Sequence, residues 1–173
     1  MTKIYKKIRY NMNMSTYKEF LDNGICNFYE GNFKNAIEDF NKSIELNKDF
    51  SVTYFYRGAS YHSIEEYDEA MLDYTKAISL DPKMTDAYYN RAKIILSRKD
   101  IQNPDIKKAI ADLEKALELD ENFADAMYAM AAAYKKLEDY HKALEYIEKL
   151  LKISPEHVYA KALKKLILQK YII

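Results

Sequence analysis

Hydrophobic and small residues recur along the chain with the spacing of one face of a helix. Similar stretches, each about a dozen residues long, follow one another through the sequence, and an α-helix with its 3.6-residue period produces this spacing. Between residues 67 and 80 the pattern is formed by Tyr67, Ala70, Met71, Tyr74, Ala77 and Ile78. The pattern predicts helices near 17–30, 34–47, 51–63, 67–80, 85–98, 104–119, 124–137, 140–153 and 156–171.

The predicted helices repeat at a regular interval along the chain. Residues 32–40 align with residues 66–74, and further copies of the same pattern lie at 106–113 and 140–147. Pairs separated by the interval of the first alignment include Gly24 and Gly58, Ala36 and Ala70, and Phe40 and Tyr74. Four copies of one pattern predict a repeat protein, in which each helix pair needs its neighbours to bury its apolar face.

These residues resemble the tetratricopeptide repeat, a helix–turn–helix unit of about 34 residues. The matching residues in the second copy are Tyr54, Gly58, Tyr61, Ala70, Tyr74, Ala77 and Pro82. The copies are placed at 17–50, 51–84, 85–123 and 124–157, and the third is five residues longer than the others. The resemblance implies an all-α fold: a right-handed α-solenoid of four helix–turn–helix repeats, followed by a C-terminal capping helix over 158–173.

Local features refine this map. The extra length of the third repeat predicts a longer turn at about 99–103, after which Asn103 caps a helix whose first residue is Pro104. The glycine at position 31 is expected in the turn between two helices. The small residues at one repeat position are expected where the two helices of a repeat cross; they are Ala36, Ala70, Ala109 and Ala143.

Composition supports a helical chain without catalytic chemistry. Only 3 Gly and 3 Pro occur among 173 residues, whereas the turns of sandwiches and barrels use both. No phosphate-binding glycine loop and no metal-binding Cys or His motif is present. The three histidines, His62, His141 and His157, fall at different repeat positions. We therefore expect neither an enzyme nor a cofactor.

The charges of the chain balance, with 27 basic and 27 acidic residues. Residues 1–16 carry a net charge of +4, as do residues 158–173, so residues 17–157 sum to −8. Without a strong overall field, neither nucleic acid nor a membrane surface is an expected partner. The segment 1–16 is predicted to be a basic N-terminal arm or a short helix.

The expected location is cytoplasmic. Cys26 is the only cysteine, which excludes an intramolecular disulfide. The first ten residues are interrupted by Lys and Arg and do not form an apolar signal core, and no run reaches the length of a membrane span.

The resemblance implies a concave surface lined by the first helix of each repeat. Aromatic side chains on such a surface are typical anchors for a bound peptide. The candidate binding residues are Phe55, Tyr56, His62, Tyr89, Asn90, Lys93, Tyr128 and Lys135. Among them, the amide of Asn90 is suited to hold a peptide backbone. The alternative is that such rings pack between adjacent repeats, which we expect for Phe28 and Tyr29.

One subtype of the family grips the C-terminal carboxylate of chaperones with Lys, Asn and Arg side chains. Of the positions that carry this clamp, only Asn90 matches, while Asp86 and Asp125 would repel the carboxylate. A chaperone-binding protein of that kind is therefore not expected.

The predicted function is that of a non-enzymatic protein–protein interaction module, which binds a peptide or partner helix and acts as a scaffold or assembly factor. The alternatives are self-association and a regulatory domain that works beside an enzyme. A homodimer through 158–173 is suggested by the last helix. We expect Tyr159, Ala162, Leu163 and Leu166 to cover the last repeat. The remaining apolar residues, which would stay exposed, are Ile167, Leu168, Tyr171, Ile172 and Ile173.

Overall fold

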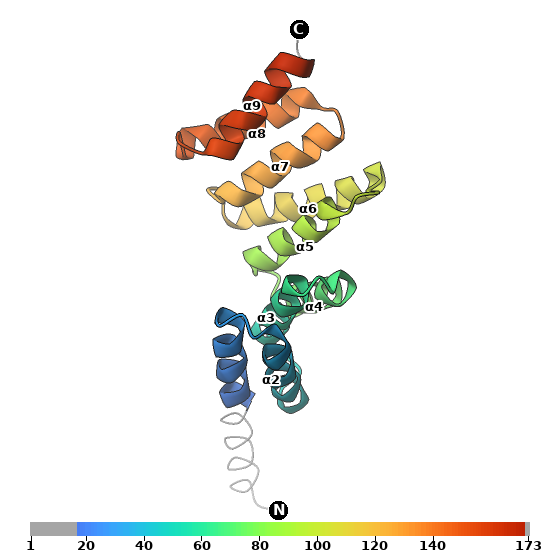
Figure 1. Ribbon diagram of the computed structural model, residues 1–173, viewed down its shortest axis with the longest axis vertical. Coiled ribbons are helices and arrows are strands. Elements are labelled where there is room, and N and C mark those ends of the chain that lie inside the picture. Colours follow the sequence, from blue (N-terminus) through green and yellow to red (C-terminus); the bar gives the residue numbers. More distant parts are fainter. Residues whose placement is uncertain (1–16, 172–173) are drawn as a thin grey trace, which may run out of the picture. The chain divides into compact units, whose positions relative to one another are not determined.

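The computed structural model of the protein describes residues 17–171 and is all-α over that range (Figure 1). Its first helix is described over residues 17–29. The helices that follow are α2 (Phe33–Leu46), α3 (Ser51–Ser63), α4 (Tyr67–Leu80), α5 (Thr85–Ser97), α6 (Asn103–Leu119), α7 (Ala124–Lys136), α8 (Tyr140–Ile153) and α9 (Val158–Tyr171). The predicted helical repeat fold is therefore confirmed.

The helices form where apolar residues recur with the helical period, and the apolar face of each helix is directed toward the core. The alanines predicted at the helix crossings are all fully buried: Ala36, Ala70, Ala109 and Ala143. Where two helices approach closely, the partner position carries a small residue as well. A Cβ atom added at Gly58 of α3 would lie 3.1 Å from the Asp73 Cβ and 3.2 Å from the Tyr74 ring of α4. Small residues therefore set the spacing of the helix pairs.

Three short turns between paired helices share one backbone conformation. Gly31, Glu65 and Glu138 have φ angles of 79°, 65° and 62°. In each turn, the backbone amide of the following residue donates a hydrogen bond to a carbonyl of the preceding helix. Glu66 N, for example, donates to the Tyr61 carbonyl at 2.9 Å. This is the left-handed helix end that favours glycine. The glycine expected in the first turn is therefore replaced by glutamate in the other two.

The turn between α5 and α6 is longer, as predicted. It occupies residues 98–102, whereas the turns at 30–32, 64–66 and 137–139 have three residues each. The predicted cap was wrong by one position. Gln102 is the N-cap, Asn103 is the first residue of α6, and Pro104 follows within the first turn, where its missing N–H costs nothing.

The chain divides into two compact units. The N-terminal compact unit ends at Ala87 and the C-terminal compact unit begins at Tyr88, so the division falls inside α5. In the N-terminal compact unit, α3 packs against both α2 and α4. In the C-terminal compact unit, α6 contacts α7, α7 contacts α8, and α8 contacts α9.

The face that the last helix buries matches the predicted one only at Leu163, and Ile167, which was expected to be exposed, belongs to it as well. Ala160, Leu163 and Ile167 lie in the core that α7 and α8 form, and Ile167 is fully buried. Tyr159, which was expected to cover the last repeat, is 71% exposed. Ala162 and Leu166 are exposed as well. The predictions for residues 1–16, for Ile172 and Ile173 and for the side chain of Tyr171 lie outside what the structure describes, and the boundaries of the four repeats stay predictions.

Candidate functional site

A three-helix ion-pair network joins α2, α3 and α4 in the N-terminal compact unit. The Arg57 guanidinium of α3 donates to Asp73 of α4 through Nε and Nη2, both at 2.7 Å, and its Nη1 donates to the Asn41 side chain of α2 at 2.6 Å. Burial raises the pKa of Asp73 and the ion pair with Arg57 opposes that shift. A bidentate Arg–carboxylate pair fixes orientation as well as distance.

The C-terminal compact unit contains a second pair of the same kind. Arg91 of α5 donates to Asp112 of α6, with Nε–Oδ2 at 2.8 Å and Nη2–Oδ1 at 2.7 Å. In α7 the equivalent residue is Met130, which is fully buried. We did not predict these pairs from the sequence. The signal that could have revealed them is that Arg57 and Arg91 occupy the same position in successive repeats.

An aromatic cluster lies beside the first of these networks. The rings of Phe28, Tyr29 and Tyr56 meet edge to face, with centroids 5.4 Å apart for Phe28–Tyr29, 5.7 Å for Phe28–Tyr56 and 6.4 Å for Tyr29–Tyr56. The Tyr56 ring also stacks on the buried ring of Phe40 at 6.2 Å. Edge-to-face contacts of this kind hold rings in place. We call Phe28, Tyr29 and Tyr56 the Tyr29 surface.

Phe28 and Tyr29 both contact Tyr56 of the next predicted repeat, as expected. Tyr29 is nevertheless 73% exposed, whereas Phe28 is half-buried. The hydroxyl of Tyr29 lies 3.4 Å from that of Tyr56. This hydrogen bond, then burial, then the nearby Asp86 carboxylate raise the pKa of Tyr56 to about 12. The Tyr29 surface therefore presents hydroxyl-bearing aromatic rings next to an acidic group.

The other candidates of the N-terminal compact unit lie along α3. Phe55 is half-buried, with its ring 5.4 Å from Tyr56 and 5.9 Å from Tyr74. His62 is half-buried as well and lies 5.7 Å from the Tyr67 ring of α4. Phe55 therefore packs against the Tyr29 surface through Tyr56, and His62 packs at the far end of α3.

The candidates on α5 differ in their surroundings. The Tyr89 ring lies 5.0 Å from Phe123, and burial raises its pKa, with Asp125 adding to the shift. Asn90 is half-buried and Lys93 is exposed. Tyr89 is thus a packing residue in this structure as much as a surface one.

On α7, Tyr128 belongs to a small aromatic group that includes α9. Its ring lies 5.5 Å from His157 and 6.3 Å from the exposed ring of Tyr159. The Nδ1 atom of His157 accepts a hydrogen bond from the Ala160 amide at 3.1 Å, which caps α9. Lys135 is half-buried near the end of α7. The contribution of Tyr159 was missed because it was assigned to the covered face of its helix.

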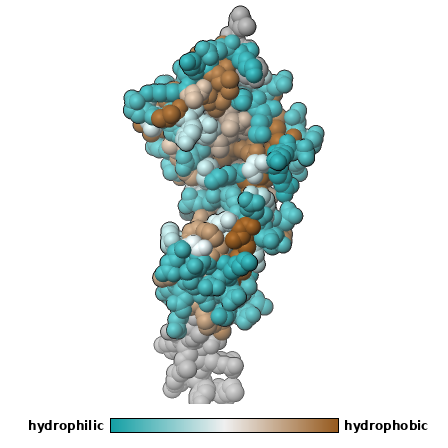
Figure 2. All heavy atoms as spheres, viewed as in Figure 1, coloured by the Kyte–Doolittle hydropathy of each residue, from teal (hydrophilic) through white to brown (hydrophobic). Residues whose placement is uncertain are grey.

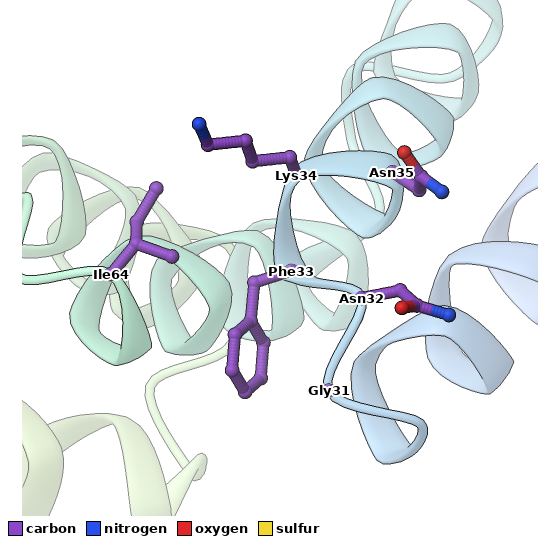
Figure 3. Close-up of a pocket in the computed structure, with 6 residues that line it drawn as sticks. All are labelled: Gly31, Asn32, Phe33, Lys34, Asn35 and Ile64. Carbon is purple, nitrogen blue, oxygen red and sulfur yellow. The ribbon is translucent and has the colours of Figure 1, made fainter.

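A separate hollow of about 350 Å³ lies where the first turn meets the end of α3 (Figure 3). It is lined by Gly31, Asn32, Phe33, Lys34, Asn35 and Ile64. The close-up shows the side chains of Phe33, Lys34 and Asn35 diverging from the start of α2, with Ile64 opposite. Because polar groups do not converge in it, the hollow lacks the fixed recognition points of a small-molecule site.

Nothing in residues 17–171 resembles a metal centre. In that range no three His, Cys, Asp or Glu side chains gather as metal ligands would. Over the same residues, every buried side-chain nitrogen or oxygen atom has a hydrogen-bond partner. None of the helices described is both long enough and apolar enough to cross a membrane.

Known proteins match the chain in sequence and in structure. Tetratricopeptide repeat protein 12 of Homo sapiens is 36% identical over 73 residues, which are 42% of this chain and 10% of that protein. Serine/threonine-protein phosphatase 5 of Homo sapiens is 38% identical over 65 residues, which are 38% of this chain and 13% of that protein. The chain thus spans only a small part of the curated relatives it matches.

A solved structure agrees over most of the chain. The crystal structure of MamA protein superposes with a TM-score of 0.81 at 25% identity, covering 89% of this chain and 81% of that one. A family model described as tetratricopeptide repeat matches residues 30–162. The chain therefore belongs to the tetratricopeptide repeat family, whose repeats generally mediate protein–protein interactions.

Proposed function

We propose that this chain is a non-enzymatic interaction module that captures a short peptide or a partner helix on the Tyr29 surface, and that it acts as a scaffold or assembly factor. The position of Tyr29 carries the proposal, because its ring is 73% exposed and yet in contact with Phe28 and Tyr56. A ring held before binding loses little conformational freedom on binding. Aromatic anchors supply much of the energy in such interfaces.

The charges around the Tyr29 surface favour one class of peptide. Asp86 lies close enough to contribute to the raised pKa of Tyr56, and Glu30, next to Tyr29, is exposed. Carboxylates at this border attract basic side chains and repel a terminal carboxylate. We therefore infer a partner segment with aromatic or aliphatic residues beside Lys or Arg, and no grip on a chaperone C-terminus.

Tyr128, His157 and Tyr159 support a second aromatic surface in the C-terminal compact unit. The exposed ring of Tyr159 lies beside Tyr128, a predicted binding residue, and enlarges the aromatic area there. Each surface is proposed in its own right. A single groove that also includes Tyr89, Asn90, Lys93 and Lys135 stays a prediction.

The test is a binding measurement with peptides selected on the whole chain from a displayed library. Affinities are then compared for the wild type and for Tyr29→Ala, Tyr56→Ala and Tyr128→Ala. Leu72→Ala is the control, because Leu72 is 72% exposed on α4 and lies outside these surfaces. We expect the first two changes to weaken binding about tenfold or more, the effect of losing one anchor. Unchanged affinity in both would contradict the proposal.

Two further roles predicted from the sequence have some support. The match to a protein phosphatase over 13% of its length is compatible with a regulatory domain beside an enzyme. The exposed Val158, Tyr159 and Leu168 of α9 are compatible with a homodimer through 158–173. Sedimentation velocity at several concentrations distinguishes a dimer from a monomer. Cytoplasmic location stays a prediction.

A further inference from the structure

The outer face of α9 corresponds to a face that other helices in this chain keep covered. Counted from the first residue of each helix, positions 4, 7, 8 and 11 of α3, α5 and α7 point to the helix that follows. In α3, Arg57 at position 7 pairs with Asp73 of α4, and Gly58 at position 8 lies against Asp73 and Tyr74. In α7, Tyr134 at position 11 stacks on Tyr146 of α8 at 5.8 Å.

The same positions of α9 are not covered within the described chain. They hold Lys161, Lys164, Lys165 and Leu168. Leu168 is 43% exposed, and Lys161 and Lys165 are exposed too. In α7 the residues at positions 4, 7 and 8, Met127, Met130 and Ala131, are buried. The face of α9 therefore corresponds in position, though not in side-chain size, to one that receives a second helix.

A pocket of about 360 Å³ marks the place where that helix would lie. Its lining is Leu151, Lys161, Lys164, Lys165, Leu168 and Gln169. Leu151 of α8 and Leu168 of α9 supply apolar walls, and the lysine stems extend them. In Figure 2, hydrophobic residues surface among hydrophilic ones at the end formed by α8 and α9. We call this pocket the α8–α9 groove.

The charges at the α8–α9 groove identify the chemistry of its occupant. Lys164 is held by Glu148 at 3.1 Å and Lys161 by Glu156 at 2.8 Å, whereas Lys165 makes no ion pair within residues 17–171. Lys164 stands at the position of Arg57 and Arg91, each of which pairs with an aspartate of the following helix. Because Lys164 is already paired with Glu148, Lys165 is the charge that an acidic group on a docking helix would match.

We propose that the α8–α9 groove binds an amphipathic helix of another protein, which inserts a large apolar side chain between Leu151 and Leu168 and places an Asp or Glu against Lys165. The bulk of Lys165 replaces the small Gly58, Ala92 and Ala131 at position 8. The incoming helix therefore sits farther out than α4 does on α3, and its side chain, rather than its backbone, fills the pocket.

A second copy of this chain fits the α8–α9 groove less well. A symmetric dimer through α9 brings the same patch of each chain together, so the lysines of one chain would face those of the other. Like charges at the centre of an interface oppose association. The homodimer through 158–173 is therefore an outcome that the test must distinguish.

The probe is a synthetic, amidated and fluorescein-labelled peptide of residues 103–119, the sequence of α6. This peptide carries Asp112 beside Leu113, and both are buried where α6 packs in its own unit. Fluorescence anisotropy measures its binding to the whole chain. We expect Leu168→Glu and Lys165→Glu each to weaken binding about tenfold or more. Lys83→Glu, a change at an exposed turn lysine, should leave binding unchanged.

A charge exchange separates the ion pair from general effects on folding. We expect the peptide with Asp112→Lys to bind poorly to the wild type and to regain affinity for the Lys165→Glu chain. Circular dichroism confirms that each variant is folded. Absence of peptide binding, or equal binding by Leu168→Glu, overturns the proposal. So does sedimentation that shows a wild-type dimer which Leu168→Glu converts to a monomer, because a second copy would then occupy the groove.

Discussion

Arg57 and Asp73 join α3 to α4 through two parallel hydrogen bonds of 2.7 Å, and the side chain of Asp73 is only 6% exposed. The third branch of the guanidinium reaches Asn41 in α2. One side chain thus joins α2, α3 and α4, and of the residues of the Tyr29 surface only Tyr56 lies on one of these helices. The same pairing recurs as Arg91–Asp112, and in α7 the arginine position is taken by the fully buried Met130.

Removing one partner of this ion pair should lower the free energy of unfolding more than replacing both partners with apolar residues. Asp73→Ala leaves the Arg57 charge partly buried without its partner, and we expect a loss of about 2–4 kcal/mol in the free energy of unfolding. The double change Arg57→Met and Asp73→Leu introduces the apolar chemistry found at Met130. It should recover most of that loss, as measured by urea denaturation. A double variant less stable than Asp73→Ala would contradict this account.

The turn at Glu65 offers a stabilising substitution. Its φ of 65° is unfavourable for a residue with a Cβ atom, and Gly31 holds the equivalent place in the first turn. We expect Glu65→Gly to raise the free energy of unfolding by about 0.5–1 kcal/mol. Glu69→Gly, at an exposed position inside α4, should lower it by about 1 kcal/mol. Thermal unfolding followed by circular dichroism gives both values, and a destabilised Glu65→Gly would show that the turn needs its side chain.

The alanine at the α3–α4 crossing should not tolerate a larger side chain. Ala70 is fully buried, so Ala70→Leu must displace its neighbours and should cost about 1–3 kcal/mol. Ala111→Leu is the matched control, because Ala111 is exposed on α6 and should change stability little. An unchanged melting temperature for Ala70→Leu would mean that the helices do not cross there.

Stability should fall in alkaline solution as Tyr56 titrates. An ordinary tyrosine loses its proton near pH 10, whereas the pKa of folded Tyr56 is raised to about 12 by Tyr29, by burial and by Asp86. Between these values the unfolded chain releases a proton that the folded chain keeps, so unfolding becomes easier as pH rises. Denaturation at pH 9 and pH 11 should show a smaller fall for Tyr56→Phe than for the wild type. An equal fall for both proteins would contradict this explanation.

The sequence predicted the helices well because apolar positions recur in every repeat. Ala36 and Ala70 could be placed at helix crossings from spacing alone, and both are buried. The partner of Arg57 could not be found that way, because a period locates a residue on its own helix but does not say which side chain of the next helix meets it. The ion pairs follow from the packing of α3 on α4.

The errors in the candidate site have a common physical cause. Phe28 and Tyr29 are neighbours in sequence and point to different surroundings, so one is half-buried and the other 73% exposed. On α9, apolar residues surround the helix, and only the position of α8 decides that Ile167 is buried while Tyr159 is exposed. Where a helix is apolar on several sides, its own sequence pattern does not determine which face is buried. The position of the neighbouring helices determines it.

The central claim is that partners bind on the Tyr29 surface, and site-specific photocrosslinking tests it most directly. A benzophenone amino acid is placed at Tyr29 in one protein and at Leu72 in another, two side chains that are 73% and 72% exposed in the same compact unit. Each protein is irradiated with a library-selected peptide, and the adduct is measured by mass spectrometry. The account predicts an adduct from position 29 and none from position 72. Equal adducts from both positions, or an adduct from position 72 alone, would contradict it.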